Sequence, residues 1–334
     1  MVEGKFGVSA KVLCDSISEA GVRLLTFEVT YARLVLSELN THRMLSRNSA
    51  SSRAIPFKKM QENLTGRPTR FGEANPGMQD TGVDYEKVVS YSDGFGRVNG
   101  SRQKGCLPGE FWEYSKGVAL DLSSAMYEAG YHKQVYNRLT EPFQMMKTVI
   151  SATEWNNFIW LRDDGAADPS IAELARCIRE ARDASTPELL KVGEWHLPYV
   201  DSSRDAAGKQ YFWMYLTDTE KIAISVEEAI KVSCARSAAV SFRNVDYGLE
   251  KCKEVYERLV GDDRKHASAL EHQACPMKPE NKGFTTGQPV NMPCASDTWE
   301  FGVSHSDRKD NLWSGNFRGW VQHRKTIAGE NKEG

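Results

Sequence analysis

Hydrophobic and β-branched residues gather in three stretches of the chain, around 11–14, 23–31 and 144–154. Aromatic residues accompany the second of these stretches. Such runs are typical of strands, because β-branched and aromatic side chains pack well on a pleated surface. The pattern therefore predicts a strand at each of the three places.

Elsewhere the apolar residues recur every three or four positions, which is the period of one helix face. Leu36 and Leu39 show this spacing and predict a helix over 32–45. Asp168 followed by Pro169 predicts the start of another helix, with the aspartate as N-cap and the proline in the first turn. Further helical segments are predicted over 110–139 with a break at Gly130, over 157–162 as a helix or turn, and over 226–241 and 246–260.

Two regions lack a clear period. Residues 64–110 are rich in glycine, proline, aspartate and asparagine, and residues 276–310 are loop-like. We interpret 64–110 as a loop-rich insertion, of the kind that can form a lid. Within it, the glycines of 94–100 lack the spacing of a dinucleotide-binding loop, so a plain turn is expected there. No linker divides the chain, and a single catalytic domain over 1–334 is predicted.

Composition narrows the class of protein. A net charge of −2 argues against nucleic-acid binding as the main task. No apolar run approaches the roughly 18 residues of a membrane span, and the first residues lack the apolar core of a secretion signal. Seven cysteines without a CxxC pair indicate free thiols and a cytoplasmic protein. The seven histidines show no metal-site spacing, so no metal is expected.

The segment 41–53, Thr-His-Arg-Met-Leu-Ser-Arg-Asn-Ser-Ala-Ser-Ser-Arg, carries the strongest chemical signal. Arg43, Arg47 and Arg53 supply positive charge, and arginine side chains match phosphate oxygens. The small residues among them leave backbone N–H groups open to an anion. Two interpretations follow: a pocket for a nucleotide phosphate, or a solvated basic turn between two helices.

The spacing in this segment resembles the signature of the flavin-dependent thymidylate synthases. That signature reads Arg-His-Arg, seven residues, Ser, and Arg two places further on. His42, Arg43, Ser51 and Arg53 match it, and Thr41 stands in place of the first arginine.

Two later segments resemble other parts of the same family. Arg138 lies four residues before a proline, as does an arginine that contacts the nucleotide in the family. Asn157, Phe158, Leu161 and Arg162 match the order of the family's Asn-Phe-x-x-Leu-Arg segment, in which the asparagine contacts the flavin and the arginine faces the pyrimidine. An ion pair of Arg162 with a neighbouring aspartate is the alternative interpretation.

A third segment, 266–272, resembles the family's His-x-Thr-x-x-Glu-His, with Ser268 in place of threonine. Ser268 and Glu271 also have the spacing of a capping box, which predicts Ser268 as the N-cap of a helix. A fourth segment, 233–242, resembles the stretch that normally opens the family's chains.

The order of these segments is unusual, because the third and fourth segments precede the arginine signature in ordinary members of the family. The chain therefore looks circularly permuted, or derived from a fused pair of copies. Residues 319–326 contain a faint second His-Arg element, which favours the fused pair. If one flavin contacts all the segments, 266–272 must lie beside Asn48 or Asn157, in the same subunit or a neighbouring one.

The resemblance implies an α/β fold, with a mixed sheet flanked by helices. It implies a homo-oligomer, a tetramer or alternatively a dimer, with each active site shared between subunits. The implied reaction is methylation of dUMP at C5 to give dTMP. FAD would be the cofactor, and NADPH and methylenetetrahydrofolate would be co-substrates.

Residue roles follow from the same resemblance, position by position. The implied flavin contacts are His42, Arg43, Met44, Asn48, Asn157, Ser268 and Glu271. The implied nucleotide contacts are Glu38, Ser49, Ala50, Ser51, Ser52, Arg53, Arg138 and Arg162. The implied catalytic residues are Arg162, Ser51 and His266.

Two departures from the family pattern keep the substrate open. Thr41 removes a cation, and Ser49 replaces a glutamate that often lies beside the nucleotide. If the chain is not a thymidylate synthase, two alternatives remain. It is a methylase or hydroxymethylase of UMP or another pyrimidine nucleotide, or a non-catalytic protein that binds a flavin or nucleotide.

Overall fold

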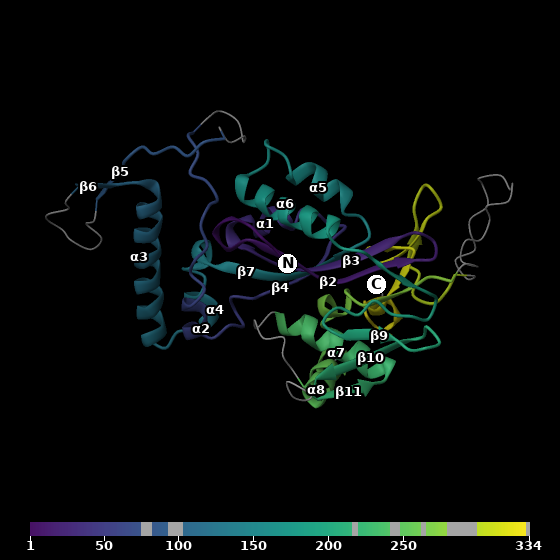
Figure 1. Ribbon diagram of the computed structural model, residues 1–334. Coiled ribbons are helices and arrows are strands. Elements are labelled where there is room, and N and C mark those ends of the chain that lie inside the picture. Colours follow the sequence, from purple (N-terminus) through teal and green to yellow (C-terminus); the bar gives the residue numbers. More distant parts are fainter. Residues whose placement is uncertain are drawn as a thin grey trace.

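The computed structural model describes residues 1–74, 82–92, 103–215, 220–240, 248–261, 265–278 and 299–331. At its centre lies a six-stranded sheet (Figure 1). The strands follow the order β1 (Val2–Glu3), β2 (Ser9–Ser18), β3 (Arg23–Ala32), β7 (Met145–Ala152) and β4 (Ser46–Ser49), with β8 (Glu188–Leu190) also beside β2. Only β8 runs parallel to its neighbour, so the sheet is mixed. The three predicted strands and the α/β class are confirmed.

One face of this sheet is apolar and is covered by α5 (Asn156–Arg162) and α6 (Pro169–Asp183) (Figure 1). Asp168 caps α6 as predicted, because its side chain accepts hydrogen bonds from the first-turn N–H groups of Ser170 and Ile171. The buried cluster between sheet and helices includes Leu25, Phe27, Val29, Ile150, Ile171, Leu174 and Ile178.

The opposite face is polar, yet it is also buried. Thr26 Oγ1 lies 2.6 Å from Ser151 Oγ and 2.7 Å from His196 Nε2. The chain of hydrogen bonds extends from His196 Nδ1 to Ser16 Oγ at 2.9 Å, and from Ser151 Oγ to His272 Nδ1 at 2.9 Å. Both histidines are fully buried, and burial lowers the pKa of each to about 3. They are therefore uncharged at neutral pH.

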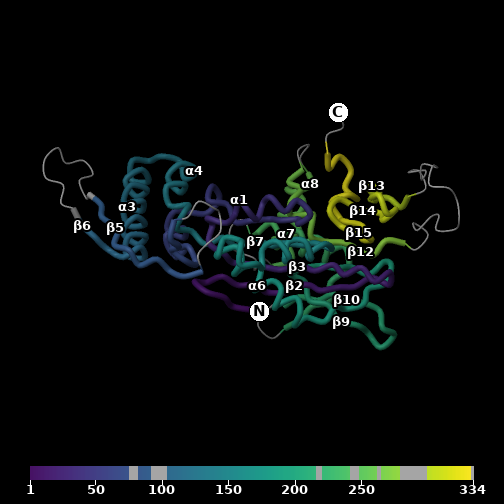
Figure 2. The backbone as a smooth tube through the Cα atoms, turned by 90° about the horizontal axis from the view of Figure 1, so that it is seen from above, coloured from purple at the N-terminus to yellow at the C-terminus, as the bar shows by residue number. Residues whose placement is uncertain are grey.

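The second half of the chain covers this polar face. Its elements include α7 (Val226–Ala239) and the paired strands β12 (Ala274–Pro276) and β16 (Trp320–Gln322) (Figures 1 and 2). A small apolar cluster around Leu24 and Trp320 closes one end of the layer. Segments far apart in the sequence thus meet across the sheet.

A second apolar core lies within this half, where α7 and α8 (Leu249–Gly261) pack beside a three-stranded sheet. That sheet consists of β9 (Asp201–Arg204), β10 (Gln210–Tyr215) and β11 (Lys221–Ile224). Near the C-terminus a further antiparallel sheet contains β13 (His305–Ser306), β14 (Leu312–Ser314) and β15 (Phe317–Arg318). Single 3-10 turns complete the described chain: η1 (Lys5–Gly7), η2 (Arg33–Val35), η3 (Glu141–Phe143), η5 (Ala267–Leu270) and η8 (His323–Thr326).

The insertion and the helix that follows it, α3 (Pro108–Glu128), form one end of the molecule, and α3 stands apart from the sheet in both views (Figures 1 and 2). Gly130, with φ +80°, separates α3 from α4 (Lys133–Tyr136), which confirms the predicted break. The described part of 64–110 is mostly irregular but contains the hairpin β5 (Val89–Ser92) and β6 (Gln103–Cys106). The glycine-rich stretch 94–100 lies outside the described residues.

The predicted helix over 32–45 is wrong. β3 continues to Ala32, and only one turn of α-helix follows, α1 (Leu36–Leu39). The signature segment then forms a turn and enters β4, which pairs with β7. The helical spacing of Leu36 and Leu39 is real but short, and pairing with β7 determines the structure beyond it. A separate short helix, α2 (Phe57–Gln61), follows the signature.

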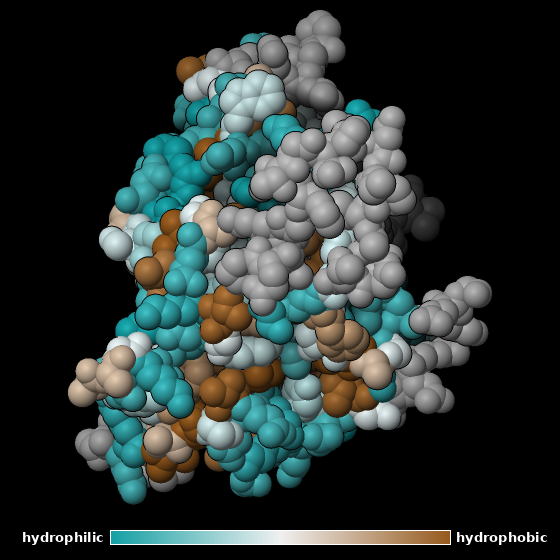
Figure 3. All heavy atoms as spheres, turned by 90° about the vertical axis from the view of Figure 1, so that its right-hand side faces the viewer, coloured by the Kyte–Doolittle hydropathy of each residue, from teal (hydrophilic) through white to brown (hydrophobic). Residues whose placement is uncertain are grey.

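Two findings describe the surface. On the face shown in Figure 3, outside the grey atoms, hydrophobic areas are interspersed with hydrophilic ones. Among the helices of the described chain, none combines the length and the apolar character that crossing a membrane requires.

Candidate functional site

The turn that follows α1 is held by Arg47 from β4. Its Nη1 donates to the carbonyl oxygens of His42 at 2.5 Å and Leu39 at 3.2 Å, and its Nη2 donates to that of Asn40 at 3.4 Å. A cation at the C-terminal end of a short helix satisfies carbonyls that have no helical partner. Burial lowers the pKa of Arg47. We conclude that Arg47 shapes the turn.

Three residues of the expected site meet beside this turn. Arg162, in the last turn of α5, donates Nε to His42 Nε2 at 2.9 Å and pairs through Nη1 with Glu38. The His42 ring also packs edge-on against Phe158, with ring centroids 4.9 Å apart. Neither Asp163 nor Asp164 is the partner of Arg162: Asp163 pairs with Arg179, and Asp164 Oδ1 accepts the Ala166 N–H at 2.8 Å.

His42 is uncharged in this arrangement. A ring nitrogen that accepts a hydrogen bond from a guanidinium cannot carry a proton, so the proton must lie on Nδ1. Burial lowers the pKa of His42, and the positive charges of Arg162 and Arg47 lower it further. The neutral imidazole therefore fixes the direction of the Arg162 fork at neutral pH.

The segment 266–272 lies beside Asn48 of the same chain. Ser268 Oγ donates to Asn48 Oδ1 at 3.1 Å, and Asn48 Nδ2 donates to the carbonyl oxygen of Ser237 at 2.6 Å. The expected neighbourhood is thus present within one chain, and a subunit interface is not needed to form it. Ser237 belongs to the fourth resembling segment, whose residues 241 and 242 lie outside the described chain.

The capping box predicted at Ser268 is absent from this segment. Residues 267–270 form a 3-10 turn, which follows His266 without a side-chain cap. The Ser268 hydroxyl is engaged by Asn48, and the Glu271 carboxylate forms an ion pair with Arg324. Both side chains therefore bind residues that are distant in the sequence instead of the neighbouring backbone N–H groups of a capping box.

The C-terminal segment 319–326 contributes residues that the sequence did not assign to the site. Gln322 Nε2 donates to the Glu271 carbonyl oxygen at 3.0 Å and to Ser46 Oγ at 3.3 Å. Arg324 holds the Glu271 side chain. The repeated His-Arg element at 323–324 was the signal that could have identified this contribution.

The small residues after Asn48 are engaged with the protein. The Ala50 N–H donates to the Lys147 carbonyl oxygen at 2.8 Å, and Ser49 Oγ accepts a hydrogen bond from Thr148 at 2.9 Å. Ser52 Oγ donates to Glu141 at 2.7 Å. The expectation that 49–52 offer open backbone N–H groups is therefore wrong at Ala50, whose N–H belongs to the sheet edge.

Arg53 and Arg138 are both exposed, and a hydrogen bond between Asn137 and Ser52 brings their segments together. Asn137 is fully buried, and its Nδ2 donates to the carbonyl oxygens of Ser52 at 2.8 Å and Ile55 at 3.0 Å. Arg53 directly follows Ser52 in the sequence, and Arg138 directly follows Asn137. The two arginines thus lie on segments that this contact joins.

The remaining expected residues lie at the surface. Arg43, Asn157 and His266 are exposed, and Met44 is 43% exposed. Ser51 is partly buried, and its carbonyl oxygen accepts hydrogen bonds from the N–H groups of residues 54 and 55. Among the described residues, neither the Asn157 nor the His266 side chain forms a hydrogen bond or ion pair with Glu38, His42 or Arg162.

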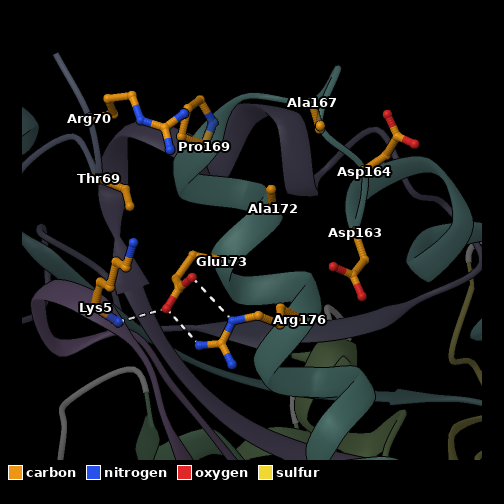
Figure 4. Close-up of a pocket in the computed structure, with 11 residues that line it drawn as sticks. Lys5, Thr69, Arg70, Asp163, Asp164, Ala167, Pro169, Ala172, Glu173 and Arg176 are labelled. Atoms are coloured by element: carbon orange, nitrogen blue, oxygen red, sulfur yellow. Dashed lines mark hydrogen bonds and ion pairs between the residues drawn. The ribbon is translucent and has the colours of Figure 1, made fainter. Parts of the chain in front are cut away.

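A pocket of about 280 Å³ lies at the start of α6, and none of the expected site residues lines it (Figure 4). Its lining mixes charges of both signs, and Glu173 binds both the Lys5 N–H at 2.7 Å and Arg176. Asp163 is the neighbour of Arg162 in sequence, but its carboxylate is paired with Arg179. Within the described residues, no group of three or more His, Cys, Asp or Glu side chains could hold a metal ion.

Comparison with known proteins gives a limited likeness. No protein-family model matches the chain, and no curated protein matches it significantly. Two solved structures of the flavin-dependent thymidylate synthase X of Helicobacter pylori, with FAD and dUMP, are similar to part of it. Their sequence identities are 16% and 18% and their TM-scores 0.32 and 0.31, over 48% of this chain and 67% of theirs. A likeness of this extent identifies neither the family nor the reaction.

Proposed function

We propose that this chain is a flavin-dependent enzyme that methylates a uridylate nucleotide at C5, converting dUMP to dTMP with methylenetetrahydrofolate and NADPH. One observation carries the proposal. Segments that resemble the family in a permuted order meet beside one strand, β4, through the Ser268–Asn48 and Asn48–Ser237 contacts. A single flavin site requires these segments to lie together, and their convergence at β4 supports the proposal.

The nucleotide phosphate is assigned to Arg53 and Arg138. Both side chains are exposed, and the Asn137 clamp holds their segments together. Ser51, which is partly buried, would lie beside the same surface toward the sugar, whereas Ser52 is buried. Because Ser52 Oγ donates to Glu141, its contribution is to hold the segment in place.

The pyrimidine is assigned to Arg162. Its guanidinium group would bind the carbonyl edge of the ring and stabilise negative charge that develops there. Glu38 and neutral His42 orient this group before the substrate arrives, which lowers the reorganisation needed during reaction. Glu38 thus acts through Arg162.

The residues around the turn fit a flavin in their chemistry. Exposed Arg43 and Met44 offer a cation and an apolar side chain, and Ser268 is joined through Asn48 to β4, the strand that follows them. Bound FAD supplies hydride chemistry that amino-acid side chains lack. Asn48 would support Ser268, Arg324 would hold Glu271, and His266 and Asn157 would reach the cofactor from the surface.

Titration with FAD tests the proposal. We expect the purified protein to carry FAD or to bind it when added, with absorption bands at about 375 and 450 nm. Quenching of flavin fluorescence on addition of protein gives the affinity. A protein that remains colourless and does not bind added FAD would contradict the assignment.

Alanine at Arg53 or Arg138 is expected to weaken nucleotide binding by about ten- to a hundredfold, because each change removes a charge-assisted contact of roughly 1.5–3 kcal/mol. Flavin binding should remain. Calorimetric titration with dUMP measures the effect. Arg308→Ala, at an exposed arginine between β13 and β14, is the matched control. Equal dUMP affinity in all three variants would show that Arg53 and Arg138 are ordinary surface residues.

The identity of the substrate is tested by profiling the loaded enzyme with dUMP, UMP and cytidine nucleotides. Ser49 bears on this choice, because its hydroxyl is bound to Thr148. Ser49 would therefore affect the substrate only through its size, because serine is smaller than the glutamate that it replaces and leaves space near the sugar. A hydroxymethylated product would identify a hydroxymethylase, and flavin binding without turnover would identify a non-catalytic flavin-binding protein. The homo-oligomer and the cytoplasmic location remain predictions.

A further inference from the structure

Arg324, at the start of the C-terminal 3-10 turn, has an acceptor at each of its guanidinium nitrogens. Nη1 pairs with Glu271, Nε donates to Glu330 at 2.7 Å, and Nη2 donates to Asn331 Oδ1 at 3.0 Å. Lys325 pairs with the other oxygen of the same Glu330 carboxylate. The Glu330 side chain is only 13% exposed. One carboxylate is therefore enclosed by an arginine and a lysine.

This arrangement has the chemistry of an oxyanion site. A guanidinium group binds phosphate oxygens directionally, and an ammonium group adds a compact point charge. Burial alone would raise the pKa of the Glu330 carboxyl, but Lys325 and Arg324 lower it below its usual range. Glu330 is thus anionic at neutral pH, in the position that a bound phosphate would take.

The segment that delivers Glu330 is a single tight turn. The Glu330 N–H donates to the Ile327 carbonyl oxygen at 3.3 Å, and Gly329 adopts φ +68°, a conformation that other residues rarely take. A Cβ atom built on Gly329 would have no atom within 4 Å, and no residue of 327–331 belongs to a buried apolar cluster. The turn can move away from Arg324 without disturbing a core.

We propose that Arg324 and Lys325 form a binding site for a phosphate-bearing ligand, which Glu330 occupies as an internal acidic plug. The ligand's phosphate displaces the Glu330 carboxylate, and the turn over 327–331 opens. Glu271 keeps its contact with Arg324 Nη1, so the ligand binds without disturbing the segment 266–272. The site does not depend on the methylation proposal, since its chemistry concerns the phosphate alone.

Calorimetric titration with inorganic pyrophosphate and with ADP, at low ionic strength, tests the plug. Glu330→Gln removes its charge while keeping its size, and we expect it to bind at least about tenfold more tightly than the unmodified protein. Adding Lys325→Gln to that variant should abolish the gain. Glu254→Gln is the matched control, because Glu254 pairs with a lysine in an exposed position on α8.

A gain with both ligands identifies phosphate groups as sufficient, and a gain with ADP alone identifies a nucleotide diphosphate. Hydrogen exchange on the unmodified protein gives a second measurement that needs no variant. Saturating ligand should speed exchange of the Glu330 amide. The proposal is overturned if Glu330→Gln binds neither ligand more tightly than Glu254→Gln does, or if exchange at Glu330 is unchanged at saturation.

Discussion

Replacement of Arg162 by alanine is expected to lower turnover of the pyrimidine nucleotide by about 100- to 1000-fold. The guanidinium group would be lost from the place where negative charge develops on the ring. Glu38 and His42 would lose the partner that both now hold. Initial rates with FAD-loaded protein, over a range of nucleotide concentrations, separate the effect on kcat from that on KM.

Arg179→Ala is the matched control for this experiment. Arg179 lies on the neighbouring helix α6 and pairs with Asp163, next in sequence to Arg162. Both variants therefore remove one arginine from an ion pair with an acidic residue, but only Arg162 is bonded to His42. A rate for Arg162→Ala close to that of the control would remove Arg162 from the reaction.

Acidification from pH 7 to pH 5 is expected to lower the free energy of unfolding by up to about 4 kcal/mol through two histidines. His196 and His272 have a pKa of about 3 in the folded protein, against an ordinary value of 6.5. The unfolded chain therefore binds two more protons between these values. Their contribution to stability is fully present above pH 6.5 and is lost progressively as the pH falls toward 3. Urea unfolding at a series of pH values measures this slope.

The variants His196→Asn and His272→Asn test the source of the slope. Asparagine keeps hydrogen-bonding groups near Thr26 and Ser151 but does not titrate. Each variant should reduce the pH dependence of the free energy of unfolding by about half of the two-histidine effect. Unchanged slopes in both variants would place the acid sensitivity elsewhere in the protein.

The sequence predicted elements whose signals are local. The strands β3 and β7 carry their own β-branched residues, and Asp168 with Pro169 marks the start of α6. The sequence did not predict the polar layer. Thr26 and Ser151 alternate with apolar residues, a pattern typical of a solvent-facing side, and only tertiary packing buries them under His196 and His272.

One neighbourhood of the candidate site was predicted from the long-range information that the resemblance supplied. It anticipated that Ser268 would lie near Asn48, although 220 positions separate them. It did not anticipate the partner of Glu271, because no short-range pattern connects that residue with Arg324. The predicted cap at Ser268 failed for the same reason: the local spacing was correct, but the side chains found partners in distant segments.

Conversion of dUMP is the most direct test of the central claim. The protein would be loaded with FAD and incubated anaerobically with NADPH, methylenetetrahydrofolate and dUMP, and the nucleotides would be identified by mass spectrometry. The account predicts dTMP that forms only when FAD and the folate are both present, and that is strongly reduced with Arg162→Ala. Protein that binds FAD and dUMP but leaves dUMP, UMP and cytidine nucleotides unchanged would contradict it.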